Sequence, residues 1–366
     1  MRSRRFTPLQ KAGQSLLESE ISTPALLLDM AAMEANLNRM AAFFQEGATR
    51  LRPHYKNHKS VALAHRQIAL GAIGMSCATL GEVEALVKAG IQSILLVNEI
   101  AGSVKIDRFA RLSQQADVIL AVDNEKTVAD LSAASARYGI PLSILVDVDT
   151  GLNRCGVAPG EPALALAQFA VRQGLKLRGV TGYEGHCGRM PPCEEKIEAT
   201  HRALEKLVST AELIRAHGLP VEIVSAGGTG TYSISGRFPG VTEIQAGSYL
   251  LMDTDYRTVC KDFDLALSVL GTVISRTGNT RLILDIGLKS ISCERGLPVL
   301  KNVGGAKIRR LTAEHAIIDI VVPDLSLQVG DHVELWAHYS DATVNLHRQM
   351  YGMRDGQVEE MFVLEG

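Results

Sequence analysis

Two histidines and two lysines are crowded into six positions of one short segment of the chain, LRPHYKNHKS at residues 51–60. They are His54, Lys56, His58 and Lys59. Neighbouring cations and partial desolvation lower the pKa of a lysine, which becomes a nucleophilic amine able to form a Schiff base with an aldehyde. At the end of a strand, Lys56 is placed for this chemistry. The alternative is that Lys56 and Lys59 are ordinary surface residues beyond that strand.

A glycine-rich stretch, SAGGTGTY at residues 225–232, follows an apolar run later in the chain. Side chains do not obstruct the backbone N–H groups around Gly227 and Gly228, so the loop can cradle a phosphate group. Hydroxyl groups beside them come from Ser225, Thr229 and Thr231. An amine for an aldehyde and a cradle for a phosphate together point to pyridoxal 5′-phosphate (PLP) as the ligand.

The elements that must position these groups follow a repeating pattern, in which short apolar runs alternate with longer amphipathic segments. Continuous Val, Ile and Leu runs are typical of parallel strands covered on both faces by helices. Residues 194–218 carry apolar side chains at helical spacing, which predicts a helix packed on a sheet. Nine strand candidates are present, at 25–29, 51–56, 74–79, 93–98, 118–123, 142–149, 177–185, 221–228 and 241–247.

The number of strand–helix units predicts a closed, TIM-like (β/α)8 barrel, since no G-x-G-x-x-G turn of an open dinucleotide-binding sheet follows the first strand. In such barrels the reactive groups lie at the carboxyl ends of strands, where Lys56 and His186 fall. After about residue 265, short apolar runs between Gly, Asp and Pro turns predict a β-rich domain. We expect a PLP-binding barrel over 25–262 and a C-terminal β-rich domain built from 1–24 with 263–366.

Composition limits the classes of partner. The 38 basic and 40 acidic residues give a net charge of −2 without long runs of either sign. This balance argues against binding to nucleic acid or to an anionic membrane, and no stretch approaches the roughly 18 apolar residues of a membrane span. Six cysteines without paired spacing are typical of a reducing compartment. We therefore expect a cytoplasmic enzyme that acts on a small neutral or zwitterionic ligand.

Six segments of the chain together resemble, in order and spacing, the PLP enzymes built like alanine racemase. The resemblance is closest to the branch that contains D-threonine aldolase, 3-hydroxy-D-aspartate aldolase, D-threo-3-hydroxyaspartate dehydratase and eukaryotic-type D-serine dehydratase. It extends over nearly the whole chain. The segments are TPALLLD, RPHYKNHKS, TGLNRCGV (150–157), GYEGH (182–186), SAGGTGTY and EIQAGSYLLMD (243–253).

The resemblance implies roles for particular residues. Lys56 matches the first Lys of the family's R-P-H-x-K-x-H-K motif and would hold the cofactor covalently. Arg154 would lie near the pyridoxal ring, and Tyr183 would contact the ring or its nitrogen. His186 would be a general acid or base, or else a structural histidine in the barrel mouth. The residues expected at the phosphate are Ser225, Gly227, Gly228, Thr229, Ser248 and Tyr249.

The same branch implies a divalent metal near the carboxyl terminus, held by a His-x-Asp or His-x-Cys pair. In HYSDATVNLH (338–347), Asp341 matches the carboxylate, but Tyr339 occupies the expected histidine position. His338, one residue further away, is the ligand that we expect to join Asp341, with His347 in reserve. Imidazole and oxygen ligands suit manganese, magnesium or zinc, of which we expect manganese. The alternative is a solvated turn without a metal.

The activity implied is that of a lyase of the D-threonine aldolase type, which cleaves β-hydroxy-D-amino acids into glycine and an aldehyde, and the family implies a homodimer. The carboxylate in HYSDATVN resembles the aldolases more than the cysteine of several dehydratases. Dehydration of D-serine or D-threo-3-hydroxyaspartate at the same site remains the alternative. A non-catalytic PLP-binding protein would lack the second domain. An alanine racemase would carry K-x-x-x-Y-G-H-G, which is missing after Lys56.

Overall fold

The structure is a computed structural model that describes residues 16–322 and 324–366, so residues 1–15 of the predicted β-rich domain lie outside it. The chain divides into two units. The barrel unit comprises Ala35–Asp264 and Leu364–Gly366, and the β unit comprises Leu265–Val363 with the described residues before Ala35. In the described part of the chain, no helix has both the length and the apolar character needed to cross a membrane.

Eight parallel strands form the sheet of the barrel unit, in the order β2-β9-β8-β7-β6-β5-β4-β3. The two ends of this order meet through a bridge between His54 and Ser76, where the Ser76 N–H donates a 2.8 Å hydrogen bond to the Pro53 carbonyl. The sheet therefore closes on itself, which confirms the predicted TIM-like barrel. Its strands are β2 (Arg50–Leu51), β3 (Met75–Cys77), β4 (Ser93–Leu96), β5 (Asp117–Val122), β6 (Ser143–Asp147), β7 (Lys176–Thr181), β8 (Ile223–Ala226) and β9 (Glu243–Ile244).

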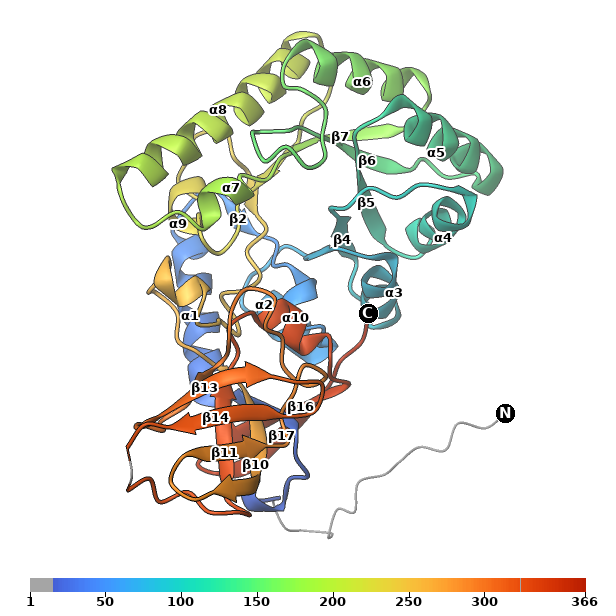
Figure 1. The fold of residues 1–366 in the computed structure, drawn as a ribbon. Helices are drawn as coiled ribbons and strands as arrows, with labels where there is room; N and C mark the ends of the chain where they lie inside the picture. The colour runs from blue at the N-terminus through green and yellow to red at the C-terminus, as the bar shows by residue number, and fades with distance from the viewer. Residues whose placement is uncertain (1–15, 323) are drawn as a thin grey trace, which may run out of the picture. The chain divides into compact units, whose positions relative to one another are not determined.

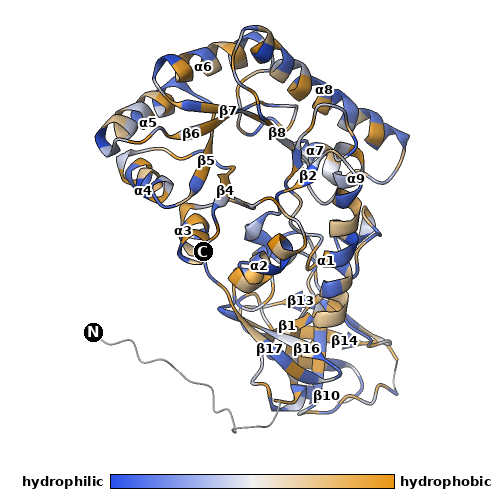
Figure 2. Cartoon of the chain, turned by 180° about the vertical axis from the view of Figure 1, so that it is seen from behind, coloured by the Kyte–Doolittle hydropathy of each residue, from blue (hydrophilic) through white to orange (hydrophobic). Residues whose placement is uncertain are grey.

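Helices surround this sheet. Figure 2 shows that the strands are largely apolar, whereas the helices around them carry both polar and apolar faces. The predicted helix over 194–218 is present as α8, in which Leu204, Leu207 and Ile214 are buried whereas Ile197 is 45% exposed. Side-chain caps from Ser60, Thr79 and Asn124 start α2, α3 and α5. The helices are α1 (Met30–Gln45), α2 (Val61–Ala69), α3 (Leu80–Lys88), α4 (Ser103–Ser113), α5 (Glu125–Tyr138), α6 (Glu161–Arg172), α7 (Gly185–Gly188), α8 (Glu194–Ala216) and α9 (Tyr232–Ser235).

The β unit is built on a mainly antiparallel sheet (Figure 1). Its strand β1 (Ala25–Asp29) is the apolar run that the sequence pattern grouped with the barrel strands. In the structure it pairs instead with β10 and β16, because an apolar run fits any buried strand and does not identify its partner. The other elements are β10 (Leu267–Thr277), β11 (Arg281–Leu284), β12 (Val299–Leu300), β13 (Ala306–Leu311), β14 (Ala316–Ile320), β15 (His332–Trp336), α10 (Ser340–Val344), β16 (Gln349–Arg354) and β17 (Gln357–Val363).

Candidate functional site

Lys56 lies at the carboxyl end of β2, in a single 3-10 turn over Tyr55–Asn57. The imidazole Nδ1 of His54 caps this turn by accepting a 3.4 Å hydrogen bond from the backbone N–H of Lys56. Tyr55 and Asn57 are buried on either side, whereas Lys56 is exposed. The turn therefore directs one lysine out of the protein at the end of the barrel where the sequence placed the chemistry.

The second lysine of the segment has a structural role. The Nζ of Lys59 donates a 3.2 Å hydrogen bond to the carbonyl of Gly366, and its own carbonyl accepts one of 2.7 Å from the Glu365 N–H. Lys59 thereby fastens Leu364–Gly366 to the barrel. Lys59 therefore holds the carboxyl-terminal residues, whereas Lys56 is the exposed lysine of the turn.

The predicted crowding of positive charge affects the pKa of His54. Burial lowers the pKa of His54 well below its usual range, and nearby positive charges lower it further. These charges belong to Lys56, His58 and Arg154. His54 is therefore neutral, and because its Nδ1 accepts a hydrogen bond, the proton is on Nε2. Arg154 and Lys56, from loops after different strands, both lie close enough to act on this one imidazole.

The glycine loop after β8 is shaped by a carboxylate that the sequence analysis did not single out. Glu184 is fully buried and accepts three hydrogen bonds. The donors are the Gly227 N–H at 3.1 Å, the Thr231 hydroxyl at 2.7 Å and the Ser235 hydroxyl at 2.6 Å. With Gly227 held at a φ of +76°, a conformation that favours glycine, the loop adopts one defined turn. Glu184 is the central residue of GYEGH, but nothing in that motif identifies its partners.

The glycine loop is joined to the loop after β9 by a 2.9 Å hydrogen bond from the Tyr249 N–H to the Thr229 hydroxyl oxygen. Around this junction Thr229, Gly247 and Ser248 are buried residues, and among the described residues no acceptor is found for their backbone N–H groups. Buried backbone donors are rarely left unsatisfied in proteins, and a concave group of them is a site for an anion. This cluster of N–H groups, the anion cradle, fits a phosphate group.

The anion cradle lies directly beside the Lys56 turn. A Cβ atom on Gly247 would come within 2.9 Å of the His54 carbonyl oxygen and 3.6 Å of the Asn57 Cβ. Because β8, β9 and β2 are adjacent in the barrel, their carboxyl ends bring the cradle and the Lys56 amine to one place. The residues therefore fit PLP, whose aldehyde and phosphate need these two groups.

Three further predicted site residues lie in the segments that follow β6 and β7. The ring of Tyr183 approaches Gly228, where a Cβ atom would lie 3.1 Å from it, so Tyr183 borders the glycine loop. Arg154 is exposed on the loop that follows β6, which begins with Asp149 accepting hydrogen bonds from the N–H groups of the residues beyond it. His186 is exposed in α7, and its ring lies 3.3 Å from the Cβ position of Gly151.

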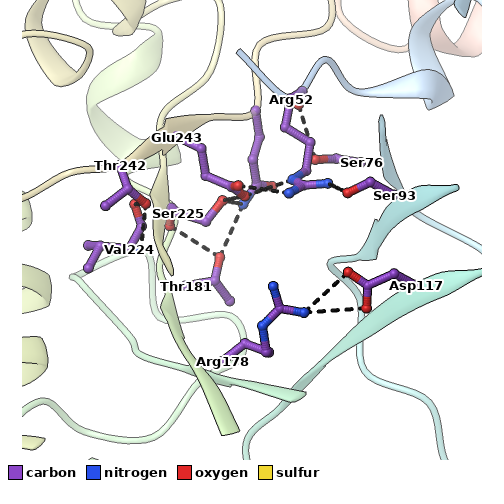
Figure 3. Close-up of polar contacts among 11 residues, drawn as sticks. Arg52, Ser76, Ser93, Asp117, Arg178, Thr181, Val224, Ser225, Thr242 and Glu243 are labelled. Atoms are coloured by element: carbon purple, nitrogen blue, oxygen red, sulfur yellow. Dashed lines mark hydrogen bonds and ion pairs between the residues drawn. The ribbon is translucent and has the colours of Figure 1, made fainter. Parts of the chain in front are cut away.

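Several predicted phosphate hydroxyls have partners within the protein. The Ser225 hydroxyl donates to Glu243 at 2.7 Å, and the Tyr249 hydroxyl accepts a 2.8 Å hydrogen bond from the Gln67 amide. Ser225 thus belongs to a polar network inside the barrel, in which the buried Glu243 carboxylate binds the Arg52 guanidinium at 2.9 and 3.0 Å (Figure 3). The hydroxyl proton of Ser225 and the backbone N–H of Tyr249 are thus already used within the protein, whereas Thr229 keeps a hydroxyl proton to donate.

A cluster of acidic groups lies at the carboxyl ends of β4, β5 and β6. The Glu99 and Asp123 carboxylates and the Cys155 thiol have ligand atoms within 4.8 Å of one another. Beside them, burial raises the pKa of Asp147 to about 8, with the hydrogen bond and charge of Glu99 and the charge of Asp123 adding to it, while Arg154 lowers it. Asp147 therefore holds a proton at neutral pH, which limits the repulsion within the cluster.

The predicted metal ligands lie in the β unit. His338 precedes α10 and Asp341 lies in its first turn, so the two residues belong to a short helical segment. His347, the reserve ligand, is turned away, because its Nε2 donates a 2.7 Å hydrogen bond to the Ser290 carbonyl. Burial lowers the pKa of His347, which keeps this ring neutral.

Two family models match the chain: "Alanine racemase, N-terminal domain" over residues 28–255 and a serine dehydratase domain over residues 266–353. D-threonine aldolase of an Arthrobacter species is 36% identical, covering 94% of this chain and 92% of that protein. 3-Hydroxy-D-aspartate aldolase of Paracoccus denitrificans is 34% identical with the same coverage. D-threo-3-hydroxyaspartate dehydratase of a Delftia species is 33% identical over 75% of this chain and 74% of that protein.

Solved structures of an aldolase and a dehydratase also match this chain. The crystal structure of D-threonine aldolase from Filomicrobium marinum superposes with a TM-score of 0.92 at 34% identity, covering 96% of both chains. The D-threo-3-hydroxyaspartate dehydratase from Delftia sp. HT23 superposes with a TM-score of 0.89 at 28% identity, covering 95% of this chain and 99% of that one. One variant of that dehydratase was solved in a metal-free form.

Proposed function

The chain belongs to the family of the alanine racemase N-terminal domain, and from that membership we propose that it is a PLP-dependent lyase that cleaves β-hydroxy-D-amino acids into glycine and an aldehyde. The observation that carries the cofactor assignment is the anion cradle beside the Lys56 turn. The choice of reaction is supported by the aldolases that match 94% of the chain at 34% and 36% identity.

We further propose that the barrel unit holds PLP through Lys56, with its phosphate on the N–H groups of Thr229, Gly247 and Ser248. The cofactor would supply an electron sink for the carbanion that bond cleavage leaves on the substrate. Lys56 would exchange the cofactor for the substrate amine and afterwards hold or return a proton at its Nζ. His54 caps the turn that presents Lys56, and the two side chains lie close enough to interact electrostatically.

Arg154 and Tyr183 would orient the cofactor ring. Arg154 is held near His54 and Asp147 by its loop, and its positive charge acts on both. The Tyr183 ring lies against Gly228, so it borders the glycine loop on the side of β7. His186 is exposed beside Gly151, where it can take or give a proton in contact with solvent.

The metal remains part of the proposal and is assigned to His338 and Asp341. An imidazole nitrogen and a carboxylate oxygen suit manganese, magnesium or zinc, and we favour manganese. A bound cation would act as a Lewis acid toward the substrate hydroxyl. Cytoplasmic location and a homodimer complete the proposal.

The proposed reaction is tested by its products. Purified protein is incubated with D-threonine, PLP and Mn²⁺, and acetaldehyde and glycine are measured in parallel with 2-oxobutanoate and ammonia. Acetaldehyde and glycine in equal amounts support the aldolase, and L-threonine serves as the stereochemical control. Formation of 2-oxobutanoate alone would instead identify a dehydratase, the alternative that the 33% identical Delftia enzyme favours.

A further inference from the structure

A cavity of about 270 Å³ lies in the barrel unit, outside the sheet. It is enclosed by α1, α2, β2 and the connection from α2 to β3, at the opposite end of β3 from the reactive loops. Its mouth is at Gln45, Arg50 and Gly71, which are exposed. Its apolar wall is formed by Leu37, Ala41, Phe44, Leu51, Leu70, Ala72 and Ile73.

The inner end of the cavity is polar and is formed by Gln67 and Tyr249, whose side chains are 2% and 1% exposed. A chain of hydrogen bonds fixes the direction in which these groups donate. The Ser60 N–H donates to His58 Nδ1, so His58 carries its proton on Nε2 and donates to the Gln67 Oε1 at 3.2 Å. The Gln67 amide nitrogen must then donate to the Tyr249 hydroxyl oxygen, at 2.8 Å.

This direction leaves the hydroxyl proton of Tyr249 to be donated elsewhere. Among the residues that the structure describes, the Tyr249 O–H has no acceptor. Burying a hydroxyl without a hydrogen-bond acceptor is unfavourable, and this hydroxyl lies at the inner end of a cavity with apolar walls. A ligand with an acceptor oxygen at its inner end would accept this proton and complete the series of hydrogen bonds that begins at Ser60.

We propose that this cavity is a binding site for a compact, uncharged molecule with an aromatic or branched aliphatic body and one acceptor oxygen. An apolar cavity of about 150 Å³ takes up benzene, so this larger chamber has room for a substituted ring. The apolar wall binds the body, and the Tyr249 hydroxyl binds the oxygen. No cationic side chain lines the inner end, so a carboxylate is excluded there.

Two probes of the same shape test this site, namely acetophenone, which has a carbonyl oxygen, and isopropylbenzene, which replaces that oxygen with a methyl group. Binding to the PLP-saturated full chain is measured by isothermal titration calorimetry. Acetophenone is expected to bind about fivefold more tightly than isopropylbenzene, because its oxygen accepts one additional hydrogen bond. In Tyr249→Phe this preference should disappear while isopropylbenzene still binds, which also shows that the chamber persists.

A filling variant locates the binding. Ala41 lines the cavity, whereas Ala42, the next residue of α1, is exposed and does not. Ala41→Leu should weaken acetophenone binding by at least about tenfold, because a close-packed interior cannot hold both groups, and Ala42→Leu should leave it unchanged. The proposal is overturned if acetophenone does not bind up to its solubility limit, or if both leucine variants bind it as the unmodified protein does.

Discussion

Gly247 packs directly against His54. A Cβ atom at position 247 would lie 2.9 Å from both the carbonyl oxygen and the Cβ of His54. A real Cβ atom does not come this close to other heavy atoms, so position 247 requires glycine. It also couples the anion cradle after β9 to the turn that carries Lys56.

Gly247→Ala should therefore weaken PLP binding, because the added methyl group pushes the cradle and the Lys56 turn apart. We expect the PLP dissociation constant to rise by about tenfold or more, measured by absorbance titration of the apoprotein. Gly47→Ala is the matched control, since a Cβ there meets only the Thr49 nitrogen at 3.9 Å. Equal affinity in both variants would show that the contact does not shape the site.

Glu184→Gln tests the residue that holds the glycine loop. Its side-chain amide would place N–H donors among three groups that already donate, so the loop should lose part of its support. Unfolding by urea should show a loss of about 1–3 kcal/mol, and PLP should bind more weakly. Glu222→Gln, at an exposed ion pair with Arg178, should change neither quantity. If the two variants behave alike, Glu184 does not organise the loop.

The ion pair between Arg52 and Glu243 is buried, with side chains 4% and 2% exposed. Glu243→Gln would leave the guanidinium without a compensating charge inside the barrel, and we expect a loss of about 3–5 kcal/mol in the free energy of unfolding. Glu84→Gln, which breaks an exposed pair with Arg108, should cost less than about 1 kcal/mol. Comparable losses would mean that the buried pair contributes no more than a surface one.

Asp147 should make stability depend on pH. Its pKa is about 8 in the folded protein, above the usual aspartate value of 3.8. Between these values the folded state binds more protons than the unfolded state, so the free energy of unfolding falls as pH rises, by at most about 1.4 kcal/mol per pH unit. The contribution is complete below about pH 4 and is lost once pH exceeds 8.

Asp147→Asn removes this titration. The variant should gain stability relative to the unmodified protein as pH increases from 5 to 9, measured by urea unfolding at each pH. Asp130→Asn, at an exposed pair with Lys126, supplies the control for the loss of one surface carboxylate. A parallel pH dependence in the unmodified protein and Asp147→Asn would contradict the protonated state assigned to this side chain.

The local motifs predicted much of the candidate site. Lys56 and the glycine loop could be proposed as site components because each lies in a short segment whose residue types indicate a specific chemistry. The barrel could be found because the continuous apolar runs recur with intervening helices, and strand ends in such a fold converge. The structure agrees, since β2, β9 and β8 are neighbours and bring both segments together.

Features that depend on distant partners were not predictable. The carboxylate of Glu184 takes its role from Gly227, Thr231 and Ser235, which lie in the glycine loop and in α9 after it. Likewise, the apolar run of β1 does not show that its partners are β10 and β16 rather than a barrel strand. Tyr249 lies in a motif that resembles a cofactor loop, yet its hydroxyl is hydrogen-bonded to Gln67, a partner 182 residues away that the motif does not reveal.

The most direct test of the account is to locate the covalently bound cofactor. The PLP-loaded protein is reduced with borohydride, digested, and examined by peptide mass spectrometry, with Lys59→Arg as the matched control. The account predicts the added cofactor mass on Lys56, unchanged in Lys59→Arg and lost in Lys56→Ala together with acetaldehyde formation. A label on any other lysine, or full activity in Lys56→Ala, would contradict it.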